Sequence, residues 1–174
     1  MAHATEVLIL QHPLEVDHAK NSARLLHLSL PNSQMLVGEA FDAHCLHAAL
    51  AVPKYAVLLY PQTAVLPQDR APEPDPVRLA DAAQVRLVVL DGTWRKSRKM
   101  LHRSPLLQGL PRLELEGVPA SNYRIRKAHK PGQLSTLEAC CAALAQLERR
   151  AETFQPLLQA FDGFVAQQLA YRAP

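Results

Sequence analysis

Asp91-Gly92-Thr93-Trp94 is the segment of this sequence whose residues could do chemistry together. It directly follows the apolar run Arg86–Leu90 and opens a stretch with helical spacing. In an open parallel sheet, ligands bind beyond the carboxyl ends of the strands, where a glycine lets the backbone approach closely and helix N–H groups point at the ligand. Asp91 could there hold an ammonium or accept a proton, while Thr93 caps the helix. In the alternative interpretation, Asp91 only caps the helix and Trp94 anchors it in the core.

Two short segments hold nine of the chain's 19 Lys and Arg residues. The first cluster follows Trp94 and consists of Arg95, Lys96, Arg98, Lys99 and Arg103, with His102 among them. The second consists of Arg124, Arg126, Lys127 and Lys130, with Tyr123 and His129 among them. If the clusters meet in the fold, they form a phosphate-binding surface beside Asp91, on which Tyr123 could stack a base. The alternative is two ordinary solvated surfaces.

Two prolines mark strand ends that could border a pocket. Gln11-His12-Pro13 ends the first apolar run, and Tyr60-Pro61 ends another. His12 is more typical of a hydrogen-bonded structural histidine than of a proton-transfer group. The sequence contains no metal-ligand spacing, nucleophilic triad, P-loop or GxGxxG motif. The missing GxGxxG counts against an ordinary Rossmann methyltransferase or dehydrogenase.

A length of 174 residues with 48% hydrophobic content predicts one domain with a buried core. The formal net charge of +3 is too small to indicate a polyanionic partner by itself. Cys45, Cys140 and Cys141 form no CxxC pair, so we expect neither a zinc site nor a disulfide framework. There is no signal-peptide pattern, and no apolar run reaches the about 18 residues of a membrane span. We therefore expect a soluble, cytoplasmic protein without metal, as a monomer rather than an oligomer.

Apolar runs alternate with helical patterns along much of the chain. The expected strands are Val7–Leu10, Met35–Val37, Ala56–Tyr60 and Arg86–Leu90. The expected helices are Val16–Leu28, Ala43–Leu50, Trp94–His102, Ser135–Arg150 and Phe154–Tyr171. Ser135 and Glu138 are spaced as a capping box, and the prolines of 61–78 predict an exposed loop. The alternation predicts an α/β fold with a mainly parallel sheet flanked by helices.

The blocks around these residues resemble the DTW-domain family, which is named for an Asp-x-Thr-Trp motif such as Asp91–Trp94. Three other blocks within residues 7–145 also match. They are His12-Pro13 with Asn21 and Leu25-Leu26, then Leu59-Tyr60-Pro61, and a C-terminal block of Ser121-Asn122-Tyr123-Arg124 followed by Leu134-Ser135-Thr136-Leu137-Glu138-Ala139. One motif alone is a weak signal, whereas four ordered blocks are specific. Family members commonly carry a cysteine-rich, apparently zinc-binding module before the His-Pro block. Eleven residues without cysteine precede His12, so we expect the catalytic core without that module.

The resemblance implies a tRNA-uridine aminocarboxypropyltransferase with one domain over residues 1–174. Such enzymes transfer the 3-amino-3-carboxypropyl group of S-adenosylmethionine (SAM) to N3 of a uridine, which makes acp3U and releases methylthioadenosine. The resemblance also implies a SPOUT-like fold whose C-terminal part forms a trefoil knot. Two rival functions remain open. One is a SPOUT-type RNA methyltransferase, which would release S-adenosylhomocysteine, and the other is an RNA-binding module without catalysis.

By the same resemblance, three segments would hold SAM. They comprise Leu59, Tyr60 and Pro61, then Asp91, Gly92, Thr93 and Trp94, and finally Asn122, Tyr123, Arg124, Leu134, Ser135 and Thr136. We expect Asp91 to be either the base toward uracil N3 or the anchor of the SAM ammonium, and Arg124 to bind the SAM carboxylate. The expected RNA-binding residues are Arg95, Lys96, Lys99, Arg126, Lys127 and Lys130.

Overall fold

The computed structural model of the chain describes residues 2–17, 21–51, 53–62, 70–115, 117 and 134–171. Within these residues, five parallel strands form one sheet in the order β2-β1-β4-β3-β5. The strands are β1 (Glu6–Gln11), β2 (Ser33–Val37), β3 (Tyr55–Leu59), β4 (Val85–Asp91) and β5 (Arg112–Leu113). The predicted α/β class with a parallel sheet is confirmed. Four of the strands had been predicted, whereas the two-residue β5 had not.

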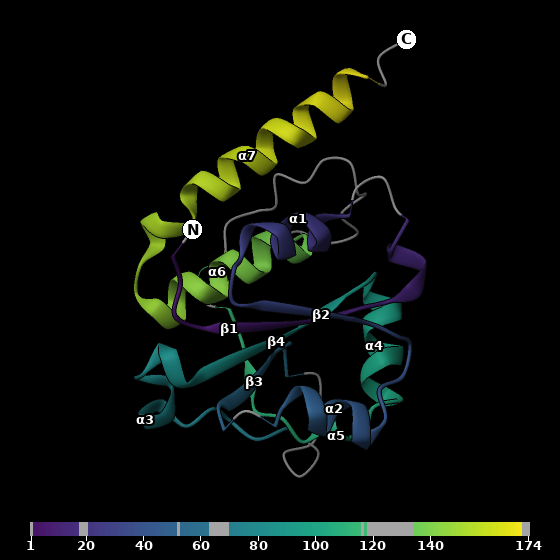
Figure 1. Cartoon of the computed structure of the whole chain (residues 1–174), viewed down its shortest axis with the longest axis vertical. Coiled ribbons are helices and arrows are strands. Elements are labelled where there is room, and N and C mark those ends of the chain that lie inside the picture. The colour runs from purple at the N-terminus through teal and green to yellow at the C-terminus, as the bar shows by residue number, and fades with distance from the viewer. Residues whose placement is uncertain are drawn as a thin grey trace.

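Helices cover both faces of the sheet (Figure 1). One face carries α1 (Ser22–Ser29) and α6 (Thr136–Glu148), and α7 (Ala151–Ala170) packs against α6 on its outer side. The other carries α2 (Ala43–Ala49), α4 (Trp94–His102) and α5 (Pro105–Gln108). Three short segments complete the described elements, namely the 3-10 turns Pro13–Glu15 and Ala82–Gln84 and the helix α3 (Pro76–Leu79).

Two hydrophobic cores lie on either side of the sheet because successive strand residues point to opposite faces. Val7 and Ile9 of β1 belong to the core under α1, α6 and α7, whereas Leu8 and Leu10 belong to the core under α2, α4 and α5. Every residue of β4 is buried, as expected for the central strand of a covered parallel sheet. This buried centre fixes the register of β1 against β4, and therefore the relative positions of the side chains at their carboxyl ends.

Some predicted boundaries were wrong for identifiable reasons. The expected helix Val16–Leu28 starts only at Ser22, because the Asn21 side chain accepts a hydrogen bond from the Arg24 amide and so caps the helix there. The expected loop 61–78 ends in helix α3, which tolerates Pro76 at its first position, where the missing N–H costs no hydrogen bond. The last helix begins at Ala151, three residues before the predicted Phe154.

Helix α6 confirms the predicted capping box, in which Ser135 accepts from the Glu138 amide and Glu138 accepts from the Ser135 amide. Cys140 and Cys141 are buried free thiols, as their place in an apolar helical stretch predicted. Burial raises the pKa of Cys141 to about 12. Arg149 ends α6 in the left-handed region with φ 53°, the only described residue other than glycine with positive φ.

The expected trefoil knot depends on the chain between β5 and α6, where 116 and 118–133 lie outside the described residues. Among the helices that the structure describes, none combines the length and the apolar character required to cross a bilayer.

Candidate active site at the carboxyl ends of the strands

The turn after β4 places Asp91 at the centre of the sheet's carboxyl edge. Asp91 is the last residue of β4 and is paired in register with Gln11, the last residue of β1. In-register residues of neighbouring strands project on the same face, so these two side chains meet. The Gln11 amide nitrogen donates to Asp91 Oδ2 at 2.9 Å and to Asn21 Oδ1 at 3.0 Å.

The first residue of α6 reaches the same carboxylate. Thr136 Oγ1 donates to Asp91 Oδ1 at 2.6 Å, so both carboxylate oxygens accept a hydrogen bond from an uncharged donor. Asp91 is 1% exposed and has no ion-pair partner among the described residues. A buried carboxylate without a counter-charge is costly, although the positive end of the α6 dipole offsets part of that cost. This arrangement suits a site that takes a cationic group.

The structure contradicts the interpretation of Asp91 as a helix cap and Trp94 as a core anchor. Thr93 caps α4 by accepting from the Lys96 amide, while the Asp91 side chain is engaged by Gln11 and Thr136. Trp94 is 45% exposed, and Met100 is the fully buried side chain of that helix. The alternative role of Thr93 as the cap, predicted from sequence, is confirmed.

The turn leaves little room for a side chain at Gly92. A Cβ placed on Gly92 would lie 3.1 Å from Lys96 Cβ and 3.6 Å from His12 Cβ. His12 is itself buried, accepts from the Leu14 amide through Nδ1, and lies 3.4 Å from Glu39 through Nε2. His12 is therefore hydrogen-bonded as predicted, whereas its structural rather than proton-transfer role stays a prediction.

Two acidic residues partly neutralise the first basic cluster. Lys96 Nζ lies 2.8 Å from Oε1 of Glu15, which is buried. Glu39 pairs with Lys99 at 2.7 Å and also with Arg103. The hydrogen bond from Lys99 is the main cause that holds the pKa of Glu39 below its usual value. Arg95 and Arg98 have no acidic partner within the described part of the chain, so they keep the uncompensated charge of α4.

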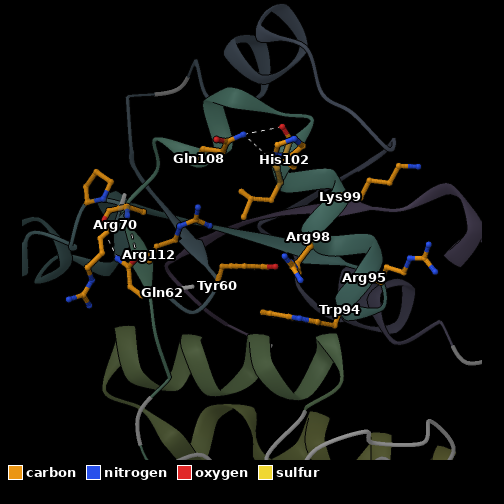
Figure 2. A pocket seen from close by; sticks show the side chains of 13 residues that line it. Tyr60, Gln62, Arg70, Trp94, Arg95, Arg98, Lys99, His102, Gln108 and Arg112 are labelled. Atoms are coloured by element: carbon orange, nitrogen blue, oxygen red, sulfur yellow. Dashed lines mark hydrogen bonds between the residues drawn. The ribbon is translucent and has the colours of Figure 1, made fainter. Parts of the chain in front are cut away.

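A stacked aromatic pair lies at the amino-terminal end of α4. The rings of Tyr60, which follows β3, and Trp94 lie 5.2 Å apart between centroids, with planes 9° apart. Burial raises the pKa of Tyr60. Figure 2 shows Trp94 between the Tyr60 ring and the green helix α6, which carries Thr136 at its start.

Tyr60 and Trp94 both line a hollow of about 660 Å³. Its wall contains Arg70, Arg95, Arg98 and Arg112, and we call it the arginine hollow. Arg112 of β5 lies with its guanidinium carbon 5.3 Å from the centroid of the Tyr60 ring. In Figure 2, Arg98 and Arg112 are turned toward Tyr60, whereas Arg95 and Lys99 point away from it.

The structure brings together part of the predicted SAM site. Tyr60, Asp91, Trp94 and Thr136 lie around the carboxyl ends of β3 and β4, with Ser135 buried as the cap of α6. Leu59 ends β3, Leu134 precedes the cap of α6, and Pro61 is exposed. Asn122, Tyr123 and Arg124 lie outside the described residues, as do Arg126, Lys127 and Lys130 of the second basic cluster. The predicted roles of all these residues stay predictions.

Sequence reasoning missed three residues that complete the arrangement. Gln11 was noted only as a strand end, although its amide holds Asp91. Arg70 and Arg112 were not considered, because each is a single cation in a proline-rich or apolar stretch. A signal was available for Gln11, since a polar residue at the end of a buried strand needs a partner. For Arg112, only the pairing of β5 with β3 reveals its place beside Tyr60.

Within the part of the chain that the structure describes, no three His, Cys, Asp or Glu side chains are grouped as a metal site would require. The expectation of a metal-free protein stays a prediction.

Comparison with known proteins adds a family match to this geometry. The model of the DTW domain matches residues 1–169. A protein of Drosophila melanogaster called tRNA-uridine aminocarboxypropyltransferase 2 is 35% identical over 160 residues, which cover 91% of this chain and 62% of that protein. Proteins of the same name from Mus musculus and Macaca fascicularis are 25% and 24% identical over 174 residues, covering 98% of this chain and 57% of each relative.

The chain thus spans about three fifths of the length of these curated relatives. No solved structure matches the chain significantly.

Proposed function

This chain belongs to the DTW domain family, and on that premise we propose that it is a tRNA-uridine aminocarboxypropyltransferase that uses SAM. The observation that carries the proposal is the family match over residues 1–169, which includes the buried Asp91 and the turn that follows it. The similarity to proteins named for this activity supports the reaction class and the tRNA substrate.

The proposed reaction is a displacement at carbon. Uracil N3 attacks the methionine Cγ of SAM, the bond from Cγ to sulfur breaks, and its electron pair leaves with methylthioadenosine. The proton of N3 passes to a base or to solvent. Because the described edge of the sheet offers no strong base, positioning of the two substrates supplies most of the rate.

We assign Asp91 to the SAM ammonium. Its two oxygens are held by Thr136 and Gln11, so the carboxylate is fixed in place before a ligand arrives. Both partners are neutral, which leaves the negative charge uncompensated among the described residues and available to a cation. An ammonium in this position gains a charge-assisted hydrogen bond. The alternative role of Asp91 as the base for N3 requires the same carboxylate, so the two roles exclude each other.

The remaining contacts to SAM follow the family resemblance. Leu59, Tyr60 and Pro61 supply one wall, Gly92, Thr93 and Trp94 another, and the segment from Asn122 to Thr136 closes the site, with Arg124 on the carboxylate. The trefoil knot and the SPOUT-like fold belong to the same proposal. A cytoplasmic location and a monomeric state also stay predictions.

Nucleoside mass spectrometry tests the reaction directly. Unmodified tRNA incubated with SAM and EDTA-treated protein should yield acp3U, with methylthioadenosine in equal amount. Release of S-adenosylhomocysteine together with a methylated base would instead identify an RNA methyltransferase. Absence of both products, with SAM binding also absent in calorimetry, would identify an RNA-binding module. Activity restored only by added zinc would contradict the metal-free expectation.

A further inference from the structure

We propose that the arginine hollow binds phosphate groups of the RNA backbone beside the uridine that is modified. The identity of the RNA rests on the proposed function, whereas the anion site rests on the hollow itself. Its described wall contains Arg70, Arg95, Arg98 and Arg112 but no Asp or Glu. The guanidinium groups of Arg98 and Arg112 face this space of about 660 Å³, and Arg70 and Arg95 lie in its wall, so the local potential is positive and favours an anion.

Arg112 gives the clearest sign that a ligand is required. The residue is 8% exposed, and its Nη1 is buried without a hydrogen-bond partner among the described residues. Burial of this guanidinium lowers its pKa, because the charged form is withdrawn from water. Buried charges in proteins are normally paired and hydrogen-bonded. Arg112 therefore lacks the partner that a phosphate oxygen would supply.

Tyr60 points to the same ligand from the floor of the hollow. Its hydroxyl is buried and forms no hydrogen bond of normal geometry within the described residues, although the Ser97 side chain lies near enough to act on its pKa. In Figure 2 the Arg98 guanidinium lies beside the hydroxyl end of Tyr60, and the Arg112 side chain extends over the other end of the ring. A phenolic hydroxyl and two guanidinium groups are all hydrogen-bond donors, so together they match the acceptor oxygens of a phosphate.

The charge of SAM excludes it as the natural occupant. SAM carries a sulfonium and an ammonium against one carboxylate, so its net charge is positive and the arginines of the hollow disfavour it. The uncompensated Asp91 lies on the α6 side and suits SAM, whereas RNA brings one negative charge per nucleotide to the arginines. Tyr60 and Trp94 stand between these two regions. This division places the RNA backbone next to, and not inside, the SAM site.

Binding of a labelled, unmodified tRNA transcript, measured by fluorescence anisotropy at several KCl concentrations, tests the inference. The variants are Arg112→Met and Arg98→Gln. The matched control is Arg78→Gln, which removes the same charge from α3, where Arg78 lies over the ring of Tyr55 at the amino end of β3. Each hollow variant should raise the Kd for tRNA about tenfold, as loss of one charged hydrogen bond implies. The slope of log K against log salt should flatten by about 0.7–0.9 per phosphate lost.

Three further measurements separate the outcomes. The melting temperature of Arg112→Met should not fall, because the variant removes a buried charge that has no partner. If the melting temperature of Arg112→Met does fall, the result for Arg98→Gln decides the test, because Arg98 is exposed. The Kd for SAM, measured by calorimetry, should stay within about twofold in every variant. ATP, which carries phosphate groups on a free nucleotide, should compete only weakly with tRNA for binding.

Equal tRNA binding by the hollow variants and by Arg78→Gln would overturn the inference. A loss of SAM affinity with unchanged tRNA binding would also overturn it. So would ATP that binds as tightly as tRNA and whose binding is abolished by Arg112→Met, because the site would then be one for a free nucleotide. Because the assay measures binding without transfer, the proposed function can fail separately. A parent protein that binds tRNA through the hollow but makes no acp3U would refute the enzyme activity and keep the RNA site.

Discussion

Asp91→Asn is the substitution that most directly tests the proposed role of the carboxylate. The structure predicts how the asparagine fits. Its carbonyl oxygen can accept from Gln11, and its amide can donate to Thr136, whose hydroxyl can rotate to accept. Gln11 cannot reverse its own amide without losing its bond to Asn21. Both hydrogen bonds therefore persist in one orientation, and Thr93 still caps α4. The variant removes the charge and little else.

The expected magnitudes follow from this fit. The free energy of unfolding should change by less than about 1 kcal/mol, since both contacts persist and the loss of the Thr136 donor's acceptor is offset by removal of a buried charge. The affinity for SAM should fall by about 1.5–3 kcal/mol, the typical contribution of a hydrogen bond to a charged group, which is roughly ten- to over a hundredfold in Kd. If Asp91 were instead the base for N3, the affinity for SAM would hold and transfer would slow by about 10²–10⁴.

Calorimetry with SAM and single-turnover transfer to tRNA, each beside the parent protein, distinguish the two roles. A urea titration of both proteins controls for folding. Values of SAM affinity and transfer rate that both stay within about twofold of the parent would refute the assignment. Asp91 would then be a structural carboxylate that joins β1, β4 and α6.

Three further predictions follow from individual contacts. Lys96→Met should lower the free energy of unfolding by about 1–3 kcal/mol in urea titrations, because it removes the ammonium 2.8 Å from the buried Glu15; unchanged stability would show that the other contacts of Glu15 suffice. Iodoacetamide should modify the half-buried Cys45 long before Cys141, because burial raises the pKa of Cys141 to about 12 and only the thiolate reacts; equal rates in peptide mass spectrometry would contradict this burial. Arg149→Gly should stabilise the protein by about 0.5–1 kcal/mol, because φ 53° strains a residue with a side chain; a lower melting temperature would contradict that reasoning.

The regular elements were predictable because local patterns determine them. Helix α4 was predicted with its correct bounds, since Thr93 caps its start and its basic residues leave Met100 to face the core. The capping box of α6 was readable for the same reason, as both of its residues lie within one turn. Hydrophobic continuity likewise gave the buried strands, with boundaries good to about two residues.

The site was only partly predictable because its decisive contacts join distant segments. Thr136 and Asp91 are 45 residues apart, and nothing local indicates that the hydroxyl donates to this carboxylate. The basic appearance of α4 was misleading in part, since Glu15 and Glu39 come from other turns of the chain and pair with Lys96 and Lys99. The charge of each residue can be read along the chain, but only the fold determines which charges remain without a partner.

The hydrogen bonds around Asp91 also link events that occur far apart in the chain. Gln11 comes from the first strand, and Thr136 starts the first of the two C-terminal helices. A ligand that binds Asp91 only when Thr136 is docked must stabilise the docked position of α6, and by reciprocity a firmer docking of α6 must tighten the ligand. Occupancy of the site would then be visible in the slowed hydrogen exchange of α6 and of α7, which packs against it. The C-terminal helices are in this sense reporters of a ligand that need not touch most of their length.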